Sequence, residues 1–267
     1  IEPWRWEFID GVSKNSNPGV YVARPCWENP KPAGEGITEY LNHAGQLACR
    51  IVIASDATEH RYNFYEGGRL AEHVIHCPSK DSWNHEHYFI NGSLSERYSY
   101  KDGDQDGERT NWFPNGRLAI RATYSEGKLD GPLFVKYESG VLAHKAQLKN
   151  GELCGYFEEW HENGQQSFKR IIGRSTSQND PEEKWYENGQ LEKRTPYHKG
   201  QIHGIEKEWY YDGRLMRQTI FSNGLKHGKC ETFDFQSNLI GVKYYEDGEE
   251  LSKTAQVLVN LGLRRPP

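Results

Sequence analysis

Three stretches of the sequence follow one pattern: Trp112-Phe-Pro-Asn-Gly-Arg-Leu118, Trp185-Tyr-Glu-Asn-Gly-Gln-Leu191 and Trp209-Tyr-Tyr-Asp-Gly-Arg-Leu215. The same frame continues through 64–70, 88–94, 136–142 and 160–166. The glycine of the pattern recurs every 23 to 25 residues, at positions 45, 68, 92, 116, 140, 164, 189 and 213. A ninth, decayed copy has Ser237 and Leu239 where glycine and leucine are expected. A fixed period of this length is the signature of a repeat architecture.

A second pair of glycines lies between consecutive copies of this pattern. Asn-Gly and Asp-Gly accept positive φ at low cost, so both glycine signals predict the turns of β-hairpins. Side chains alternate between the turns, as at Leu118, Ile120, Ala122 and Tyr124, which favours strands over helices. Each unit therefore contributes two strands, and the fold class is all-β, an antiparallel meander. The glycine pairs read Gly127-Lys-Leu-Asp-Gly131, Gly151-Glu-Leu-Cys-Gly155, Gly200-Gln-Ile-His-Gly204 and Gly224-Leu-Lys-His-Gly228.

Equivalent positions in the repeats predict which side chains stack across the sheet. Same-face neighbours on adjacent strands lie about 4.5–5.5 Å apart, so a recurring aromatic residue becomes a ladder. One face is expected to carry an aromatic and leucine spine, including the column Phe64, Tyr88, Trp112, Trp160, Trp185 and Trp209. A second column, six residues after the leucine, is Tyr100, Tyr124, Leu148, Ile172, Tyr197, Phe221 and Tyr245. The opposite face is expected to carry Phe113, Tyr137, His161, Tyr186 and Tyr210 among many charges.

The repeat divides the chain into three parts. Residues 40–251 form an elongated, single-layer array of about nine hairpins, because each repeat packs only on its neighbours. Residues 1–39 lack the repeat and are expected to cap the first edge of the array. Residues 252–267 cap the other edge, with a short helix over 252–263. Its predicted N-cap is Ser252, the apolar residues Val257, Leu258 and Leu261 lie on one side, and Gly262 ends it.

Composition excludes several classes of protein. Of the 267 residues 33 are Lys or Arg and 38 are Asp or Glu, so the net charge is −5 and no basic stripe marks a nucleic-acid binder. Hydrophobic residues make up 35%, and no run approaches the roughly 18 apolar residues of a membrane-spanning helix. Aromatic residues nevertheless reach 13%, which disordered chains lack. These values indicate a folded, turn-rich chain.

The cysteines and the first residue bear on the compartment. Five cysteines without a Cys-x-x-Cys pair are not typical of a disulfide scaffold, and the odd count leaves at least one free thiol. Cys154 and Cys230 are expected to be small buried residues, and a bond between Cys26 and Cys49 stays open. The chain begins at Ile1, so we expect a periplasmic protein whose export signal was removed, with the cytoplasm as the alternative.

The two glycine signals, with Trp or Tyr before Asn-Gly-x-Leu at a 24-residue period, resemble the bacterial variant of the MORN repeat. The pattern is similar to proteins of the YwqK family of antitoxins and extends over roughly 40–251. The resemblance implies a sheet of hairpins. It also implies an immunity or antitoxin protein that binds and occludes a cognate toxin, in some systems an effector delivered by type VI secretion, such as a phospholipase.

The sequence departs from the repeat at 173–183, where Gly-Arg-Ser-Thr-Ser-Gln-Asn-Asp-Pro replaces the second glycine pair. Aromatic residues on the opposite face near this loop are candidates for contacts with a partner, because tyrosine and tryptophan are enriched in interface hot spots. Acidic residues of the loop would steer a basic partner. The alternative is packing of this face on its own twisted sheet or on a second copy. The predicted partner-binding residues are Phe113, Tyr137, His161, Tyr186, Tyr210, Asp180, Glu182 and Glu183.

Catalytic motifs of the common hydrolases and nucleotide-binding enzymes are missing from the sequence, so we expect no enzyme, no catalytic residue and no cofactor. Five histidines lie between 60 and 87. His73, His85 and His87 are the weak candidates for a zinc site, if His73 lies on the same face as the other two across the turn at 77–82. The alternative is that they are ordinary residues of the sheet surface, with His76 in the aromatic column.

Three functions remain open at this point. Neutralisation of a cognate toxin comes first. The second is a MORN-type scaffold or lipid-surface module, although the net charge and the scattered Lys and Arg residues argue against binding to an anionic membrane. The third is a metal-dependent hydrolase built around the histidines. The sequence does not identify the toxin or the oligomeric state.

Overall fold

The computed structural model describes residues 34–172 and 180–266, and most of the predicted N-terminal cap (1–33) and of the irregular loop (173–179) lies outside them. Twenty strands belong to one antiparallel sheet, and consecutive strands pair as hairpins. The predicted all-β meander is therefore confirmed. The contacts within the chain divide it into two compact units, residues 1–118 and 119–267. The boundary between them lies inside one strand.

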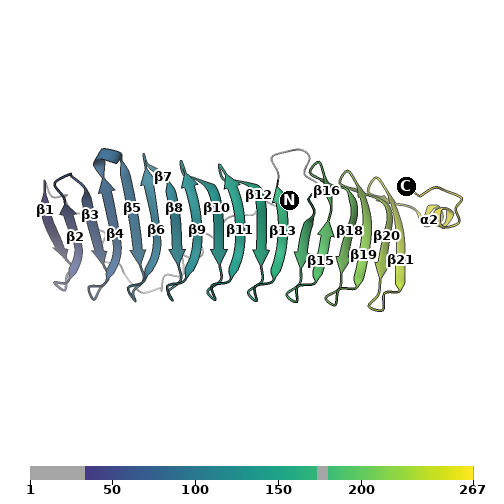
Figure 1. The fold of residues 1–267 in the computed structure, drawn as a ribbon, viewed down its shortest axis with the longest axis horizontal. Helices are drawn as coiled ribbons and strands as arrows, with labels where there is room; N and C mark the ends of the chain where they lie inside the picture. Colours follow the sequence, from purple (N-terminus) through teal and green to yellow (C-terminus); the bar gives the residue numbers. More distant parts are fainter. Residues whose placement is uncertain (1–33, 173–179, 267) are drawn as a thin grey trace. The chain divides into compact units, whose positions relative to one another are not determined.

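Unit 1 is a single layer of hairpins in which each strand from β1 to β5 pairs with the next (Figure 1). The first strand begins at Gly36, four residues before the predicted start of the array. The short strand β7 and strand β8 both pair with β6, and they are the two parts of one predicted strand. The elements are β1 (Gly36–Leu41), β2 (Leu47–Ile53), β3 (Glu59–Phe64), β4 (Leu70–Cys77), the 3-10 helix η2 (Pro78–Lys80), β5 (Ser82–Tyr88), β6 (Leu94–Lys101), β7 (Asp104–Gln105) and β8 (Gly107–Trp112).

Unit 2 repeats the same hairpins and ends in a helix (Figure 1). Strands β16 and β17 form a small ladder of their own, where the predicted long strands are interrupted. The elements are β9 (Leu118–Ser125), β10 (Lys128–Lys136), β11 (Leu142–Lys149), β12 (Glu152–Trp160), β13 (Gln166–Ile172), β14 (Glu182–Trp185), β15 (Leu191–Thr195), β16 (Tyr197–His198), β17 (Gln201–Ile202), β18 (Gly204–Trp209), β19 (Leu215–Ser222), β20 (Leu225–Phe233), β21 (Leu239–Glu246), β22 (Glu249–Glu250) and α2 (Lys253–Asn260).

Both glycine signals form the predicted turns. In the first, the Phe113 amide donates to the carbonyl of Arg117 (2.8 Å), and Gly116 has a φ of 81°. The side chain of Asn115 accepts from the amide of Arg117 and so rigidifies the turn. In the second, Glu126 and Gly127 both have positive φ, as the tight two-residue hairpin turn requires. Even the decayed ninth copy keeps its turn, with Ser237 at a φ of 65°.

The last glycine of each pair lies opposite a large residue of the second predicted column. Gly131 pairs with Leu148, Gly155 with Ile172, Gly204 with Phe221 and Gly228 with Tyr245. The two sequence signals therefore describe one structural feature, in which a large side chain lies beside a backbone position without one. In unit 2, Ala122, Leu133 and Ala146 continue the buried row next to Leu148.

Helix α2 confirms the predicted C-terminal element, because the Ser252 hydroxyl accepts from the amide of Ala255 as an N-cap. Its buried residue is Val259, whereas the apolar residues Val257, Leu258 and Leu261 are exposed. The Tyr244 hydroxyl on β21 donates to the side-chain oxygen of Asn260 (3.1 Å), which ties the helix to the last long strand. The described part of the chain holds no helix with the length and apolarity that crossing a membrane requires.

The cysteines follow the predictions in part. Cys49 is disulfide-bonded and almost fully buried in β2, beside Ile51. Cys230 is a buried free thiol as predicted, and Cys154 is half-buried. Cys77 is also free and lies at the end of β4. A disulfide is typical of proteins that fold in an oxidising compartment.

Candidate functional site

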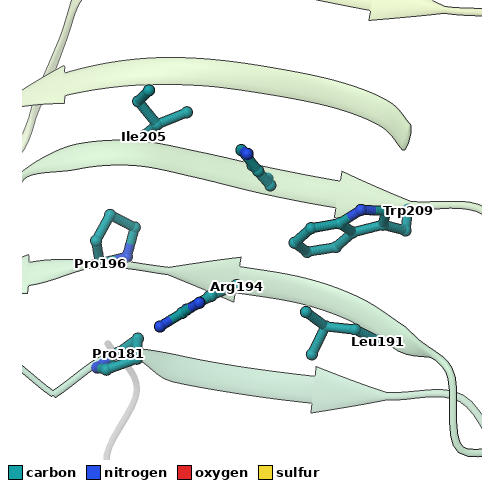
Figure 2. A pocket seen from close by; sticks show the side chains of 7 residues that line it. Pro181, Leu191, Arg194, Pro196, Ile205 and Trp209 are labelled. Atoms are coloured by element: carbon teal, nitrogen blue, oxygen red, sulfur yellow. The ribbon is translucent and has the colours of Figure 1, made fainter. Parts of the chain in front are cut away.

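A shallow recess of about 320 Å³ opens on one face of unit 2, over strands β15 and β18. Figure 2 shows the indole of Trp209 beside Leu191, with Arg194 reaching toward Pro181. Most of the residues that line the recess are apolar, and two cationic side chains, Arg194 and Lys207, line it as well. The full lining is Pro181, Leu191, Arg194, Pro196, Ile205, Lys207 and Trp209.

Proline at position 196 accounts for the recess. Proline has no amide hydrogen, so it ends β15 at Thr195, and β15 pairs with β18 through only two residue pairs. Facing it, Gly204 has no side chain, and a Cβ there would lie 3.4 Å from the Pro196 ring. Ile205, the residue after Gly204 on β18, is 49% exposed.

The acidic residues predicted beside this region are paired within the chain. Glu182 and Glu183 lie on β14, where Glu182 faces Arg170 (3.6 Å) and Glu183 faces the recess residue Arg194 (3.4 Å). Asp180 is exposed. Glu182 and Glu183 are therefore already engaged with arginines of the same chain, and their role in steering a basic partner stays a prediction.

The predicted partner-binding aromatic residues are half-buried, not exposed, because they link successive repeats. The Tyr137 hydroxyl donates to the carbonyl of Trp160 (2.8 Å), 23 residues further along the chain. Tyr186 donates to Trp209 and Tyr210 to Phe233 in the same way, and a ring nitrogen of His161 lies 2.9 Å from the Trp185 carbonyl. Burial raises the pKa of Tyr137 and of Tyr186. Phe113 occupies the equivalent turn but has no hydroxyl to donate.

We expect the variant Tyr186→Phe to lower the free energy of unfolding by about 1 kcal/mol, because the Trp209 carbonyl loses its donor. The matched control is Tyr211→Phe, whose ring is exposed. Urea unfolding followed by tryptophan fluorescence compares the two midpoints. Equal midpoints for both variants and the unmodified chain would show that the hydroxyl bond between repeats adds no stability.

In unit 1 the histidines lie on both faces of the sheet. Strands β4 and β5 pair in a register that places His73 opposite Glu86, and Val74 opposite His85. His73 therefore faces the other side from His85 and His87, and its predicted place in a zinc site was wrong. The turn through η2 sets this parity, which a one-residue change in turn length would reverse.

Both ring nitrogens of His73 already face other side chains on its own side of the sheet. Its ring nitrogen lies 3.2 Å from that of His60, and it stacks on Tyr62 with ring centroids 4.4 Å apart. Glu86 lies 3.5 Å from its other nitrogen and accepts a hydrogen bond from Arg97. Burial lowers the pKa of His73, although Glu86 opposes the change.

The opposite face of unit 1 brings His85 and His87 together with Glu72, a residue that the sequence analysis did not single out. Glu72 pairs directly with His87 across the sheet. The ligating atoms of these three residues all lie within 4.8 Å of one another. The sequence contained a signal for Glu72. Side chains alternate between the faces of a strand, so if His73 lies on one face, the preceding residue, Glu72, lies on the face of His85 and His87.

Ring stacking in the described residues also differs from the predicted tryptophan ladder. It concentrates around the histidines of unit 1, where His76 stacks on Trp83 (3.8 Å between centroids) and His85 on Tyr98 (4.9 Å). His76 therefore belongs to an aromatic stack, as predicted, through its contact with Trp83.

Comparison with protein families decides what kind of repeat this is. Residues 105–126 and 181–199 match the MORN repeat variant. The second match covers β14, β15 and several residues of the recess, and the first covers the turn at Gly116. No curated protein matches the chain. The hairpin repeat is therefore of the MORN type, and the match identifies the repeat without identifying a partner.

Proposed function

We propose that this chain is a non-catalytic, partner-binding repeat protein, and that the partner is a cognate toxin that it occludes as an immunity protein. The observation that carries the binding role is the recess on unit 2. Of its apolar side chains Ile205 is exposed and the others are half-buried, and its tryptophan and arginine are the residue types that dominate interface hot spots. The toxin as partner is supported by the resemblance of the repeat to that of bacterial antitoxins.

Exposed apolar residues extend the recess across neighbouring strands. Ile205 pairs with Ile220 on β19, and both are exposed. A contiguous exposed apolar surface of this kind is typical of a protein interface. Most of the other large exposed apolar residues of the described chain also belong to unit 2: Tyr211, Leu225, Phe235, Leu239, Ile240, Val257, Leu258, Leu261 and Leu263.

We further propose the periplasm as the compartment. The disulfide at Cys49 supports it, because structural disulfides persist where thiols are not kept reduced. A toxin that acts on the cell envelope, such as a phospholipase delivered by type VI secretion, would meet an immunity protein in that compartment.

The test is co-expression with toxins encoded beside the gene, followed by calorimetry on the purified pair. We expect the chain to restore growth and to bind with one-to-one stoichiometry. The variant Ile205→Asp should weaken binding by about 30-fold, the effect of a hot-spot residue, because it puts a charge into the apolar recess. The matched control is Ile37→Asp, at a similarly exposed isoleucine in unit 1.

The outcomes separate the alternatives. If growth is not restored and no toxin binds, the immunity role is wrong. If the toxin binds but Ile205→Asp and Ile37→Asp bind equally well, the recess is not the contact surface. Sedimentation of the chain with anionic vesicles, in the absence of toxin binding, would favour the lipid-surface role.

A further inference from the structure

We propose that Glu72, His85 and His87 form a binding site for a divalent transition-metal ion, with Zn²⁺ as the fitting class. The site lies on one face of unit 1, on strands β4 and β5, and is separate from the recess of unit 2. Two imidazoles and one carboxylate are a ligand set that zinc accepts, with an open fourth position.

The distances are close to those that a bound ion needs. Glu72 Oε1 lies 3.7 Å from His85 Nδ1 and 3.7 Å from His87 Nε2. Tetrahedral ligands at zinc bond lengths of about 2.1 Å are separated by roughly 3.4 Å. A shift of a few tenths of an ångström would bring the carboxylate oxygen to ligand spacing from each imidazole, and the ligand atoms of all three residues already lie within 4.8 Å of one another.

One ligand atom lacks a hydrogen-bond partner. His85 Nδ1 is buried and makes no hydrogen bond, and it faces Glu72 at a distance too long for one. An unsatisfied buried nitrogen costs about 1–3 kcal/mol, so it calls for a ligand or another explanation. On the other face, the His60 and His73 rings lie within hydrogen-bond distance of each other, and the carboxylate beside them, Glu86, is paired with Arg97.

Neighbouring side chains hold the ligands in place. Asn63 donates to Glu72 Oε2 (2.6 Å) and leaves Oε1 directed at the histidines. Tyr98 stacks on His85, and its hydroxyl lies 3.0 Å from His87 Nε2, so this hydrogen bond has to break when that nitrogen binds the ion. Supporting contacts of this kind orient metal ligands and raise affinity.

The charge and the exposure of the site also suit a cation. Glu72 brings a carboxylate between the two histidines and the amide of Asn63, and a bound cation would balance its negative charge. The nearby carboxylate Glu96 is neutralised by Arg109, which leaves Glu72 as the charge that faces the ion. Glu72 and His85 keep 20% of their side-chain surface exposed and His87 keeps 35%, so an ion can enter from solvent.

Isothermal titration of the untagged full chain with Zn²⁺, together with metal analysis after dialysis, tests the site. We expect one equivalent of Zn²⁺, and affinity reduced by about 100-fold or more in His85→Gln and in His87→Gln, because changes to supporting residues alone cost 10–100-fold. The matched control is His73→Gln, which removes a histidine of the same strand pair from the opposite face. Cys77→Ser in every variant excludes binding at the thiol.

Three results would overturn the proposal: no stoichiometric Zn²⁺ on the unsubstituted chain, binding that survives both glutamine variants, or an equal loss in His73→Gln. If a variant fails to fold by circular dichroism, chemical modification of histidines in the unsubstituted chain decides instead. Zn²⁺ should protect His85 and His87 from modification and leave His60 and His73 unprotected, and equal reactivity with and without Zn²⁺ contradicts the site.

Discussion

The variant Gly131→Ala is expected to destabilise unit 2 by about 3 kcal/mol or more. Gly131 has a φ of 137°, a region that residues with a Cβ scarcely enter and that costs about 1–3 kcal/mol. A Cβ at this position would also lie 2.9 Å from the Cβ of Thr123, and overpacking of this kind adds about 1–3 kcal/mol. Urea unfolding followed by tryptophan fluorescence measures the loss as a shift of the midpoint.

A second glycine separates the two contributions. Gly151 also has positive φ (83°), but no heavy atom lies within 4 Å of the place where its Cβ would be. Gly151→Ala should therefore cost only about 1–2 kcal/mol from backbone strain. In the double variant Gly131→Ala with Thr123→Gly, the part due to the clash should be recovered. If Gly131→Ala and Gly151→Ala shift the midpoint equally, the close approach to Thr123 has no energetic weight.

The period of the glycines was enough to predict the turns and the meander. A turn residue with positive φ depends only on the local sequence, so the residue type at that position indicates the turn. Gly116 and Ser237 illustrate this, since the predicted turn forms at both, with and without glycine. The N-cap at Ser252 was predictable for the same reason: its partner is three residues away.

Features that depend on register or on neighbouring strands were predicted less well. His73 was assigned to the wrong face because its parity depends on the length of the turn through η2, which the histidine spacing does not contain. Tyr186 was read as an exposed contact residue, yet its partner is a carbonyl one repeat away. The recess arises from Pro196 and Gly204 on different strands, so neither residue alone indicated it.

The variant Leu148→Ala is expected to lower the stability of unit 2 by about 2–5 kcal/mol, because Leu148 is completely buried (0% exposed) and its truncation leaves a cavity. It pairs with Gly131 on one side and with Leu153 on the other, and the glycine has no side chain that could fill the space. The matched control is Leu225→Ala, at a half-exposed leucine of β20, which should cost far less.

Hydrogen exchange on the Leu148→Ala variant reports how far this loss spreads. Repeats contact only their neighbours, so protection should fall most in β10, β11 and β12 and little in β20 and β21. Arrays of this kind depart from two-state unfolding, which is why strand-by-strand protection tests the expectation better than a single free energy. A uniform loss from β10 to β21 would mean that unit 2 unfolds as one cooperative body. In that case a partner bound at the recess would stabilise the distant hairpins as strongly as the strands it touches.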